Sequence, residues 1–225
     1  MIHGNSEFQR FYDEYMGVKN GKYIEDILMC ESQYRDQPLN KHYVYKIIVT
    51  NYKGKKIVSH ASEYSSDEVQ DVCCKLDISG IENEIPQKNL EISKCEQSYM
   101  YRMIQKKRIQ NELSTELLLI EGEEVEFIYI EEYKKIIAFA KEKLLGYCKI
   151  SDIVCGFGNI VVWVEEKYRR LGLAERLLNG IIYQCYKDKI VPMYIVKSDN
   201  EASIRLANKM GFDIVQIEFV ISQYI

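Results

Sequence analysis

The feature that most constrains the fold is the run I-V-V-W-V at residues 160–164, in which every side chain is apolar. A strand that is apolar at every position needs cover on both faces, which is typical of a central strand in a sheet flanked by helices. Helix, strand, helix and strand patterns follow it at residues 172–187, 191–196, 200–210 and 212–222. Strands that alternate with helices in this way predict a mixed sheet in an α/β fold.

The strands before this run form antiparallel pairs in our prediction. Short apolar stretches at residues 116–120 and 125–130 are separated by E-G-E, and those at 135–140 and 144–153 by K-E-K. Such spacing predicts hairpins. The C-terminal half therefore contains the elements of a mixed sheet with helical cover.

The first hundred residues predict a smaller α/β domain. Aromatic residues recur at helical spacing over residues 7–16. The β-rich run 42–50, a turn-like N-Y-K-G and a second run at 56–60 predict a hairpin, and a helix begins near Ser66. The many tyrosines of this half belong either to a stacking pocket for an organic substrate or, as we favour, to the core.

A helix with a basic patch is predicted over residues 99–112, and we interpret the patch, residues 106–108, as a solvated face. We place the domain boundary near residue 110. The N-terminal α/β domain then covers residues 1–110, with an accessory or acceptor-site role, and the C-terminal domain covers 111–225.

Charge and composition exclude several classes of protein. The formal net charge of −4 and the pI of about 5.6 argue against a nucleic-acid partner. Apolar runs stay well short of the roughly 20 residues that a membrane helix requires, and the N-terminal stretch has no signal-peptide layout. We therefore expect a cytoplasmic protein that binds neither membrane nor nucleic acid.

The seven cysteines and three histidines do not predict a metal site. The cysteines are odd in number and contain no C-x-x-C pair, and the histidines all lie in the first third of the chain. We interpret the cysteines as buried or partly buried free thiols in a reducing compartment. The motifs for nucleoside triphosphates and for dinucleotides, G-x-x-x-x-G-K-[ST] and G-x-G-x-x-G, are also absent.

The turn before the helix at 172–187 is unusual in its charge. Arg169 and Arg170 precede a helix N-terminus, which carries a partial positive charge and favours acidic neighbours. The two arginines make sense if an anion binds there, with Gly172 letting the backbone come close to it. The alternative is that both side chains point into solvent and that Gly172 only eases the turn.

A second motif opens the last helix. Asn200 is a good N-cap residue, Ser198 and Glu201 have capping-box spacing, and Gly211 suits the helix C-terminus. Together, R-R-L-G-L-A at 169–174 and N-E-A-S through G-F at 200–212 resemble the GNAT N-acetyltransferase superfamily. The sequence of the two motifs is most similar to that of a bacterial branch of the superfamily with an extra N-terminal domain.

The resemblance implies a GNAT acyl-CoA N-acyltransferase fold in the C-terminal half. It implies transfer of an acetyl group from acetyl-CoA to a primary amine of a small molecule or peptide, by direct attack in a ternary complex and without a metal. The pyrophosphate would lie on the backbone of the turn, the pantetheine arm along the preceding strand, and further contacts on the last helix. The implied coenzyme-binding residues are Val162, Trp163, Val164, Arg169, Arg170, Leu171, Gly172, Leu173, Ala174, Asn200 and Ser203.

The sequence departs from the family pattern at one position. Ala207 stands where many members have a tyrosine that protonates the leaving thiolate, so Tyr224, water or no specific group takes that role. Of the two carboxylates at the end of the strand, we favour Glu165 over Glu166 as the general base. Two other interpretations remain: an acyl-CoA-binding or interaction module that has lost catalysis, and an α/β protein with chance motif matches.

Overall fold

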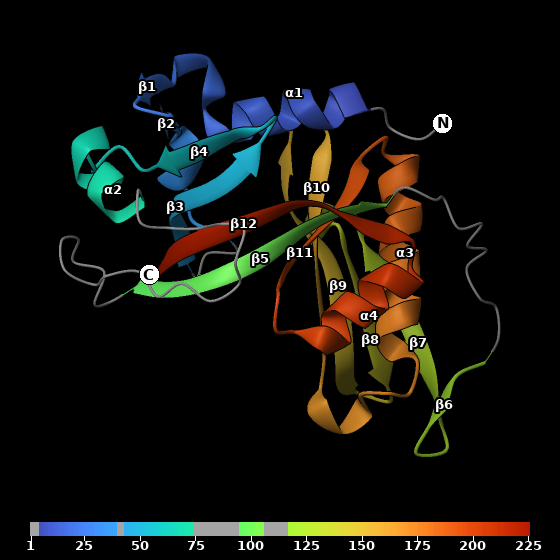
Figure 1. Ribbon diagram of the computed structural model, residues 1–225. Coiled ribbons are helices and arrows are strands. Elements are labelled where there is room, and N and C mark those ends of the chain that lie inside the picture. Colours follow the sequence, from blue (N-terminus) through green and yellow to red (C-terminus); the bar gives the residue numbers. More distant parts are fainter. Residues whose placement is uncertain (1–4, 40–42, 74–94, 106–116) are drawn as a thin grey trace. The chain divides into compact units, whose positions relative to one another are not determined.

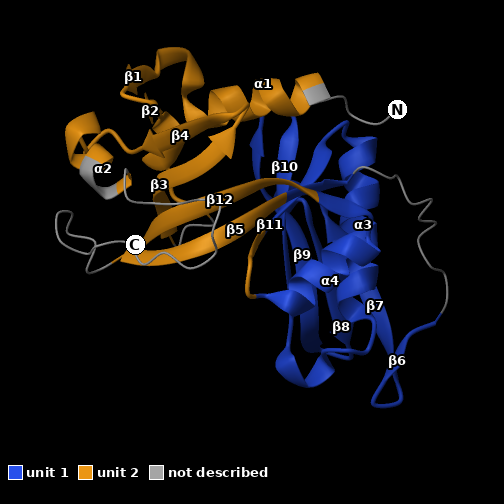
Figure 2. Cartoon of the chain, in the orientation of Figure 1, with its two compact units in different colours: residues 1–3, 103–195, 200–213 blue, residues 4–102, 196–199, 214–225 orange. Residues whose placement is uncertain are grey.

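The computed structural model describes residues 5–39, 43–73, 95–105 and 117–225 (Figure 1). The boundary predicted near residue 110 lies outside these residues. The chain divides into two compact units (Figure 2). Unit 1 comprises the described residues of 103–195 and 200–213, and unit 2 comprises those of 4–102, 196–199 and 214–225. No helix in the described ranges is long and apolar enough to cross a membrane.

Unit 1 contains a mixed sheet with the strand order β11-β10-β9-β8-β7-β6. Neighbouring strands are antiparallel except for β10 and β11, which are parallel. The hairpins and the mixed α/β fold class predicted from the sequence are confirmed. The strands are β6 (Leu119–Ile120), β7 (Glu123–Ile130), β8 (Lys135–Ala140), β9 (Lys143–Val154), β10 (Phe157–Val164) and β11 (Val191–Lys197).

Helix α3 (Leu173–Lys187) packs against β8, β9 and β10. Its apolar stripe, which includes Leu177, Ile181 and Cys185, is buried, as the 3.6-residue spacing predicts. Helix α4 (Glu201–Lys209) follows β11 and leads into β12 (Phe212–Tyr224). Both helices are where the sequence predicts them.

The strands of unit 2 follow the order β1-β2-β4-β3-β12-β5. Strands β2 and β4 are parallel, whereas β3 pairs antiparallel with β4 and with β12. The predicted hairpin and both predicted helices are present; β1 and β2 are additional strands that the sequence analysis did not identify. The elements are α1 (Asn5–Met16), β1 (Lys22–Ile24), β2 (Ile27–Glu31), β3 (Tyr43–Tyr52), β4 (Lys55–His60), α2 (Ser66–Cys73) and β5 (Cys95–Gln105).

Short 3-10 helices complete both units. In unit 2 they are η1 (Val18–Asn20) and η2 (Gln33–Arg35), and in unit 1 they are η4 (Glu131–Tyr133) and η5 (Glu166–Tyr168).

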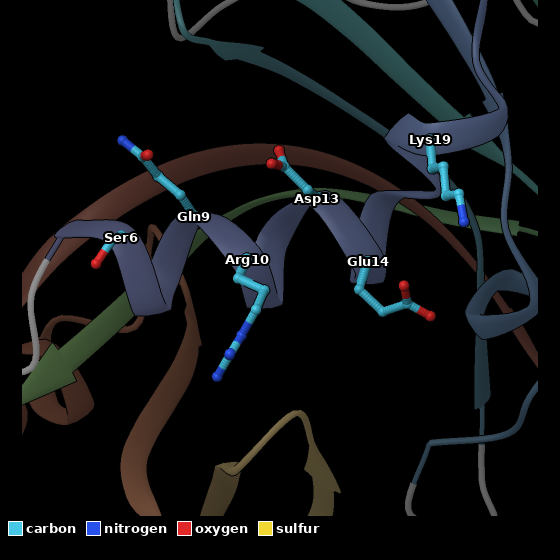
Figure 3. Close-up of a pocket in the computed structure, with 6 residues that line it drawn as sticks. All are labelled: Ser6, Gln9, Arg10, Asp13, Glu14 and Lys19. Atoms are coloured by element: carbon cyan, nitrogen blue, oxygen red, sulfur yellow. The ribbon is translucent and has the colours of Figure 1, made fainter.

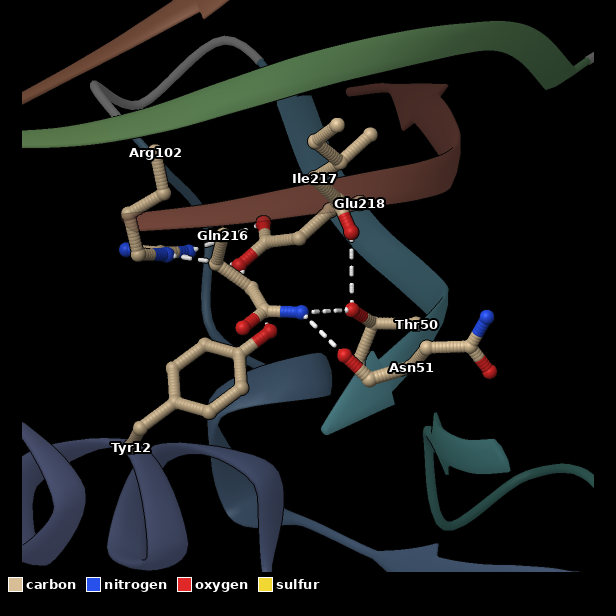
Figure 4. A network of polar contacts seen from close by, with 7 residues as sticks. All are labelled: Tyr12, Thr50, Asn51, Arg102, Gln216, Ile217 and Glu218. Carbon is tan, nitrogen blue, oxygen red and sulfur yellow. Dashed lines mark hydrogen bonds and ion pairs between the residues drawn. The ribbon is translucent and has the colours of Figure 1, made fainter. Parts of the chain in front are cut away.

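The aromatic residues of α1 form a core layer of unit 2, which favours the structural interpretation of these tyrosines. Phe11 and Tyr12 are fully buried, and the Tyr12 ring meets that of Tyr52 edge to face at a centroid distance of 4.9 Å. A buried ion pair lies in the same layer (Figure 4): Arg102 Nε donates to Glu218 Oε1 at 2.6 Å, and the Tyr12 hydroxyl donates to the same oxygen at 2.8 Å. Thr50 donates to the carbonyl of Ile217 at 2.7 Å.

The helix predicted over residues 99–112 is wrong in its described part, because residues 99–105 belong to strand β5. This segment lies next to β12 in the sheet, a neighbour far away in the sequence that a local pattern does not identify. Arg102 within it is buried, and Glu218 of β12 neutralises its guanidinium. The remainder of the predicted helix and its basic patch at 106–108 lie outside the described residues.

The six described cysteines are free thiols. Four of them are buried and Cys95 is half-buried, as expected, but Cys155 is exposed in the turn between β9 and β10. Burial raises the pKa of Cys185 to about 12, so this thiol remains protonated. Reactive thiolate chemistry at that position is therefore disfavoured.

Candidate functional site

Strands β10 and β11 part halfway along their length. Their parallel pairing runs from Phe157–Val191 to Ile160–Tyr194 and then ends. On the other side, β10 stays paired with β9 through Val164. The four residues after Ile160 therefore lack the β11 partner that the earlier part of β10 has.

Strand alternation identifies the backbone groups that this parting exposes. The N–H of Glu165 donates to the carbonyl of Leu145 on β9, at 2.9 Å. Every second residue of an antiparallel strand bonds to the same neighbour, so the N–H and C=O of Val162 and Val164 point away from β9. Arg169 Nε donates to the Val164 carbonyl at 3.2 Å. Val162 thus presents an N–H and a C=O to which an extended ligand can bind as an added strand.

The turn after β10 ends in a helix N-terminus without a side-chain cap. Gly172 occupies the N-cap position with φ of 82°, and the first helical hydrogen bond runs from Arg176 N to Gly172 O at 3.2 Å. Within the described chain, nothing accepts from the N–H groups of Leu171, Gly172, Leu173 or Ala174. These donors, together with the helix dipole, suit an anion.

The space beside Gly172 is open. A Cβ atom built on Gly172 would meet nothing within 4 Å. Arg169 and Arg170 are exposed, so their positive charges lie at the surface of the turn. The residues present therefore fit a pyrophosphate group, which needs several N–H donors and positive charge around it.

The second predicted segment also lies in unit 1. Asn200 caps α4, since its side-chain oxygen accepts from the N–H of Ser203 at 3.2 Å. Within the described residues the Asn200 amide NH₂ has no partner, so it remains able to donate to a ligand. The capping role assigned to Ser198 and Glu201 is not observed, because Asn200 occupies the N-cap position.

Ser203 lies beside a residue that the sequence analysis did not select. The side chain of Ser203 interacts with the Tyr194 hydroxyl, and burial raises the pKa of this tyrosine more than Ser203 lowers it. Tyr194 is buried on β11 at the point where β10 leaves it. No sequence signal distinguishes this tyrosine from the core tyrosines, because its place depends on the strand register.

The proposed general base, Glu165, and the predicted pantetheine-binding residues Trp163 and Val164 lie at the end of β10. Glu165, half-buried, directly follows β10, whereas Glu166 is exposed in η5. Trp163 is 38% exposed and Val164 is buried. Ala207 is fully buried in α4 and offers no hydroxyl. The structure thus places Glu165 and every predicted coenzyme-binding residue in unit 1, at the end of β10, in the turn after it, or at the start of α3 and α4. Tyr224, the alternative proton donor, lies in unit 2, where its hydroxyl donates to Glu96 Oε2 at 2.8 Å.

A pocket of about 380 Å³ lies along α1 in unit 2 (Figure 3), lined by Ser6, Gln9, Arg10, Asp13, Glu14 and Lys19. It contains none of the predicted site residues, and its charges are mixed. In the described part of the chain, no group of three His, Cys, Asp or Glu side chains is placed to hold a metal ion.

Comparison with known proteins adds a family match. The profile of the acetyltransferase (GNAT) family matches residues 100–212, which is half of the chain. None of the curated proteins matches this chain.

Several solved structures are similar at low identity. A protein from Novosphingobium aromaticivorans assigned to the GNAT family is 14% identical, with 58% of this chain and 66% of that chain covered and a TM-score of 0.44. A GCN5-related N-acetyltransferase from Sphaerobacter thermophilus is 14% identical, with 60% and 54% covered and a TM-score of 0.45. The ribosomal-protein-S18-alanine N-acetyltransferase from Escherichia coli is 18% identical, with 43% and 71% covered and a TM-score of 0.34. This chain thus spans just under two thirds and about half of the first two structures.

Proposed function

The chain belongs to the acetyltransferase (GNAT) family, and on that premise we propose that it transfers the acetyl group of acetyl-CoA to a primary amine of a small molecule or peptide. The observation that carries the proposal is the parting of β10 from β11 directly before a turn rich in free N–H groups. A strand edge and an anion-binding helix N-terminus then follow one another along the chain. A pantetheine arm that ends in a pyrophosphate needs these two features in this order.

In this proposal the turn binds the pyrophosphate. The N–H groups of Leu171, Gly172, Leu173 and Ala174 donate to its oxygens, whereas the N–H of Arg169 already donates to the Glu166 carbonyl at 3.2 Å. The side chains of Arg169 and Arg170 place positive charge beside the phosphates. The backbone of Val162 pairs with the amides of the pantetheine arm, flanked by Trp163 and Val164. The amide of Asn200 donates to the same arm, with Ser203 one helical turn further on.

The chemistry is direct acyl transfer. The coenzyme supplies an acetyl thioester; the amine nitrogen of the acceptor attacks its carbonyl carbon, a C–N bond forms, and the C–S bond breaks to release the coenzyme thiol. The N–H of Val162 donates to the carbonyl oxygen as negative charge develops there. Glu165 collects the proton of the amine through water. With Ala207 in place of a tyrosine, water returns a proton to the thiolate, whose modest basicity permits this.

One observation favours a second candidate function. Ala207 removes the usual proton donor, which is compatible with a module that binds acyl-CoA without turning it over. Release of coenzyme thiol in the presence of amines distinguishes the two, because only the enzyme consumes the thioester.

The first test is thermal unfolding with and without saturating acetyl-CoA, with desulfo-CoA as the non-reactive control. A ligand at 100 times its dissociation constant stabilises a protein by about 2.7 kcal/mol, so we expect a clear rise in melting temperature with both compounds. Thiol release is then followed with a panel of amines. Unchanged melting at millimolar concentrations of both compounds would contradict the coenzyme site.

A further inference from the structure

The sheet of unit 1 has two different faces beside the parting of β10 and β11. Strand pairing places Ile136, Cys148 and Val162 on one face, where α3 packs and the interaction of Cys148 with Cys185 of α3 is found. The alternate residues occupy the other face. They are Lys135 and Ile137 on β8, Tyr147 and Lys149 on β9, and Val161 and Trp163 on β10.

This second face carries an aromatic pair at the end of β10. The rings of Tyr147 and Trp163 stack with centroids 5.5 Å apart and an interplanar angle of 28°. Trp163 is 38% exposed, so the pair offers ring surface to a ligand. We refer to Tyr147 and Trp163 as the aromatic platform.

Two positive charges flank the platform. Lys135 Nζ lies 4.2 Å from the centroid of the Tyr147 ring, and Lys149 is two residues from Tyr147 on the same face of β9. Lys135 and Lys149 are direct cross-strand partners. Like charges directly opposite each other destabilise a sheet.

Among the described residues neither lysine has a carboxylate within ion-pair distance, and both are half-buried. The charge of Lys135 faces the Tyr147 ring. Two lysines on paired residues of neighbouring strands, without a carboxylate partner, suit an anionic group, in particular a carboxylate.

The position of the pair relates it to the proposed chemistry. Lys149 is paired with Val161, and Tyr147 with Trp163, so their cross-strand partners are the two neighbours of Val162, and the thioester would lie along the edge of Val162 that faces away from β9. We propose that the acceptor is an amine that also carries a carboxylate, bound by Lys135 and Lys149, and an apolar or aromatic part that lies on the aromatic platform. This inference rests on the proposed function and specifies the class of its acceptor. The carboxylate is not changed in the reaction; only the amine nitrogen exchanges a proton for the acetyl group.

The test compares amines with and without a carboxylate. L-phenylalanine, L-phenylalaninamide and phenethylamine are supplied with acetyl-CoA, and kcat/KM is measured from thiol release. We expect the kcat/KM of L-phenylalanine to exceed that of both analogues, which lack the carboxylate, by about tenfold or more, the range of one well-placed charge interaction. Equal kcat/KM for the three amines would overturn the proposal.

The variants Lys135→Met and Lys149→Met connect the preference to the two lysines. Each should reduce about tenfold the ratio of kcat/KM for L-phenylalanine to kcat/KM for L-phenylalaninamide, chiefly through the KM of L-phenylalanine. Lys149→Arg should retain this ratio. Lys187→Met, which removes an exposed lysine at the end of α3, is the matched control and should leave the ratio unchanged. Because removing one lysine relieves repulsion, Lys149→Met should unfold at the same temperature as the parent or higher. An unaltered ratio in both methionine variants would refute the role of the lysines.

A binding measurement separates failure of this inference from failure of the proposed function. N-acetyl-L-phenylalanine and its amide are titrated calorimetrically into the protein saturated with desulfo-CoA. Tighter binding of the acid, lost in the double Lys→Met variant, supports the carboxylate site even without turnover. Equal binding of acid and amide, together with a normal melting shift from acetyl-CoA, overturns the site and leaves the proposed function standing. Absence of that melting shift counts against the proposed function itself.

Discussion

Two residues of the turn before α3 have a positive φ, Arg170 at 65° and Gly172 at 82°. Glycine adopts this conformation without steric cost, whereas any other L-residue pays about 1–2 kcal/mol. Arg170 therefore stores strain beside the free N–H groups of the turn. Strain of this kind is often retained where a backbone conformation serves binding, which agrees with a pyrophosphate site.

We predict that Gly172→Asp weakens desulfo-CoA binding at least about tenfold, that is by about 1.4 kcal/mol or more, because a carboxylate would lie where the phosphates bind. Gly156→Asp is a matched control, since Gly156 has the same φ of 82° and a Cβ there also meets nothing within 4 Å. Both variants should lose about 1–2 kcal/mol of unfolding free energy from backbone strain. Calorimetric affinities that are equal in the two variants would contradict the assigned turn.

The two helices of unit 1 begin in different ways. In α4 the side chain of Asn200 occupies one N–H of the first turn, while α3 begins at Gly172 with no side-chain cap. A helix end without a cap needs other partners for its N–H groups. Helix α3 is also tied to the end of α4 by an ion pair, since Lys209 Nζ lies 2.6 Å from Glu175 Oε2. The helix that lacks a cap is therefore the one suited to bind an anion.

We predict that substitutions at Asn200 separate its capping role from ligand binding. Asn200→Asp keeps a side-chain acceptor for the Ser203 N–H but loses the amide donor, so stability should persist while coenzyme affinity falls. Asn200→Ala loses both and should lower the free energy of unfolding by about 1 kcal/mol. Denaturant unfolding and calorimetry measure the two effects. If Asn200→Asp binds desulfo-CoA as tightly as the parent, Asn200 is only a cap.

The stability of the whole chain should depend on the buried polar layer of unit 2. Burial, and then the negative charge of Glu218, raise the pKa of Tyr12 well above its ordinary value of 10.0. Burial also raises the pKa of Tyr45. The folded protein thus keeps these phenolic protons at a pH at which the unfolded chain has lost them.

We predict that the free energy of unfolding falls as the pH rises above about 10, because there the unfolded chain binds fewer protons than the folded one. The slope for each such tyrosine approaches about 1.4 kcal/mol per pH unit. Tyr12→Phe should make the slope shallower, and Tyr45, Tyr194 and the buried thiols contribute to the remainder. Tyr133→Phe, which alters a tyrosine that is 61% exposed, is the control. Denaturant unfolding between about pH 9 and pH 11 gives the slopes, and identical slopes in parent and Tyr12→Phe would contradict the buried network.

The element pattern of unit 1 could be predicted because its signals are local. Alternating and continuous apolar runs, two-residue turns, an N-cap asparagine and a glycine before a helix each depend on residues close in sequence. The same signals placed the turn at 169–174 and the start of α4 correctly. Strands β1 and β2 were missed because they are short and lack a clear alternation.

The sequence by itself determined the order of most helices and strands, the mixed α/β class, and the two motifs of the candidate site. Only the tertiary structure decided that residues 99–105 form a strand, which lies next to β12 and whose buried Arg102 pairs with Glu218, 116 residues away. Only strand register could show where β10 leaves β11, and that Lys135 and Lys149 are directly opposite each other beside the aromatic platform. The physical reason is the same in each case: propensity and capping act between neighbours in the chain, whereas charge compensation and strand pairing depend on which distant residues the fold brings together.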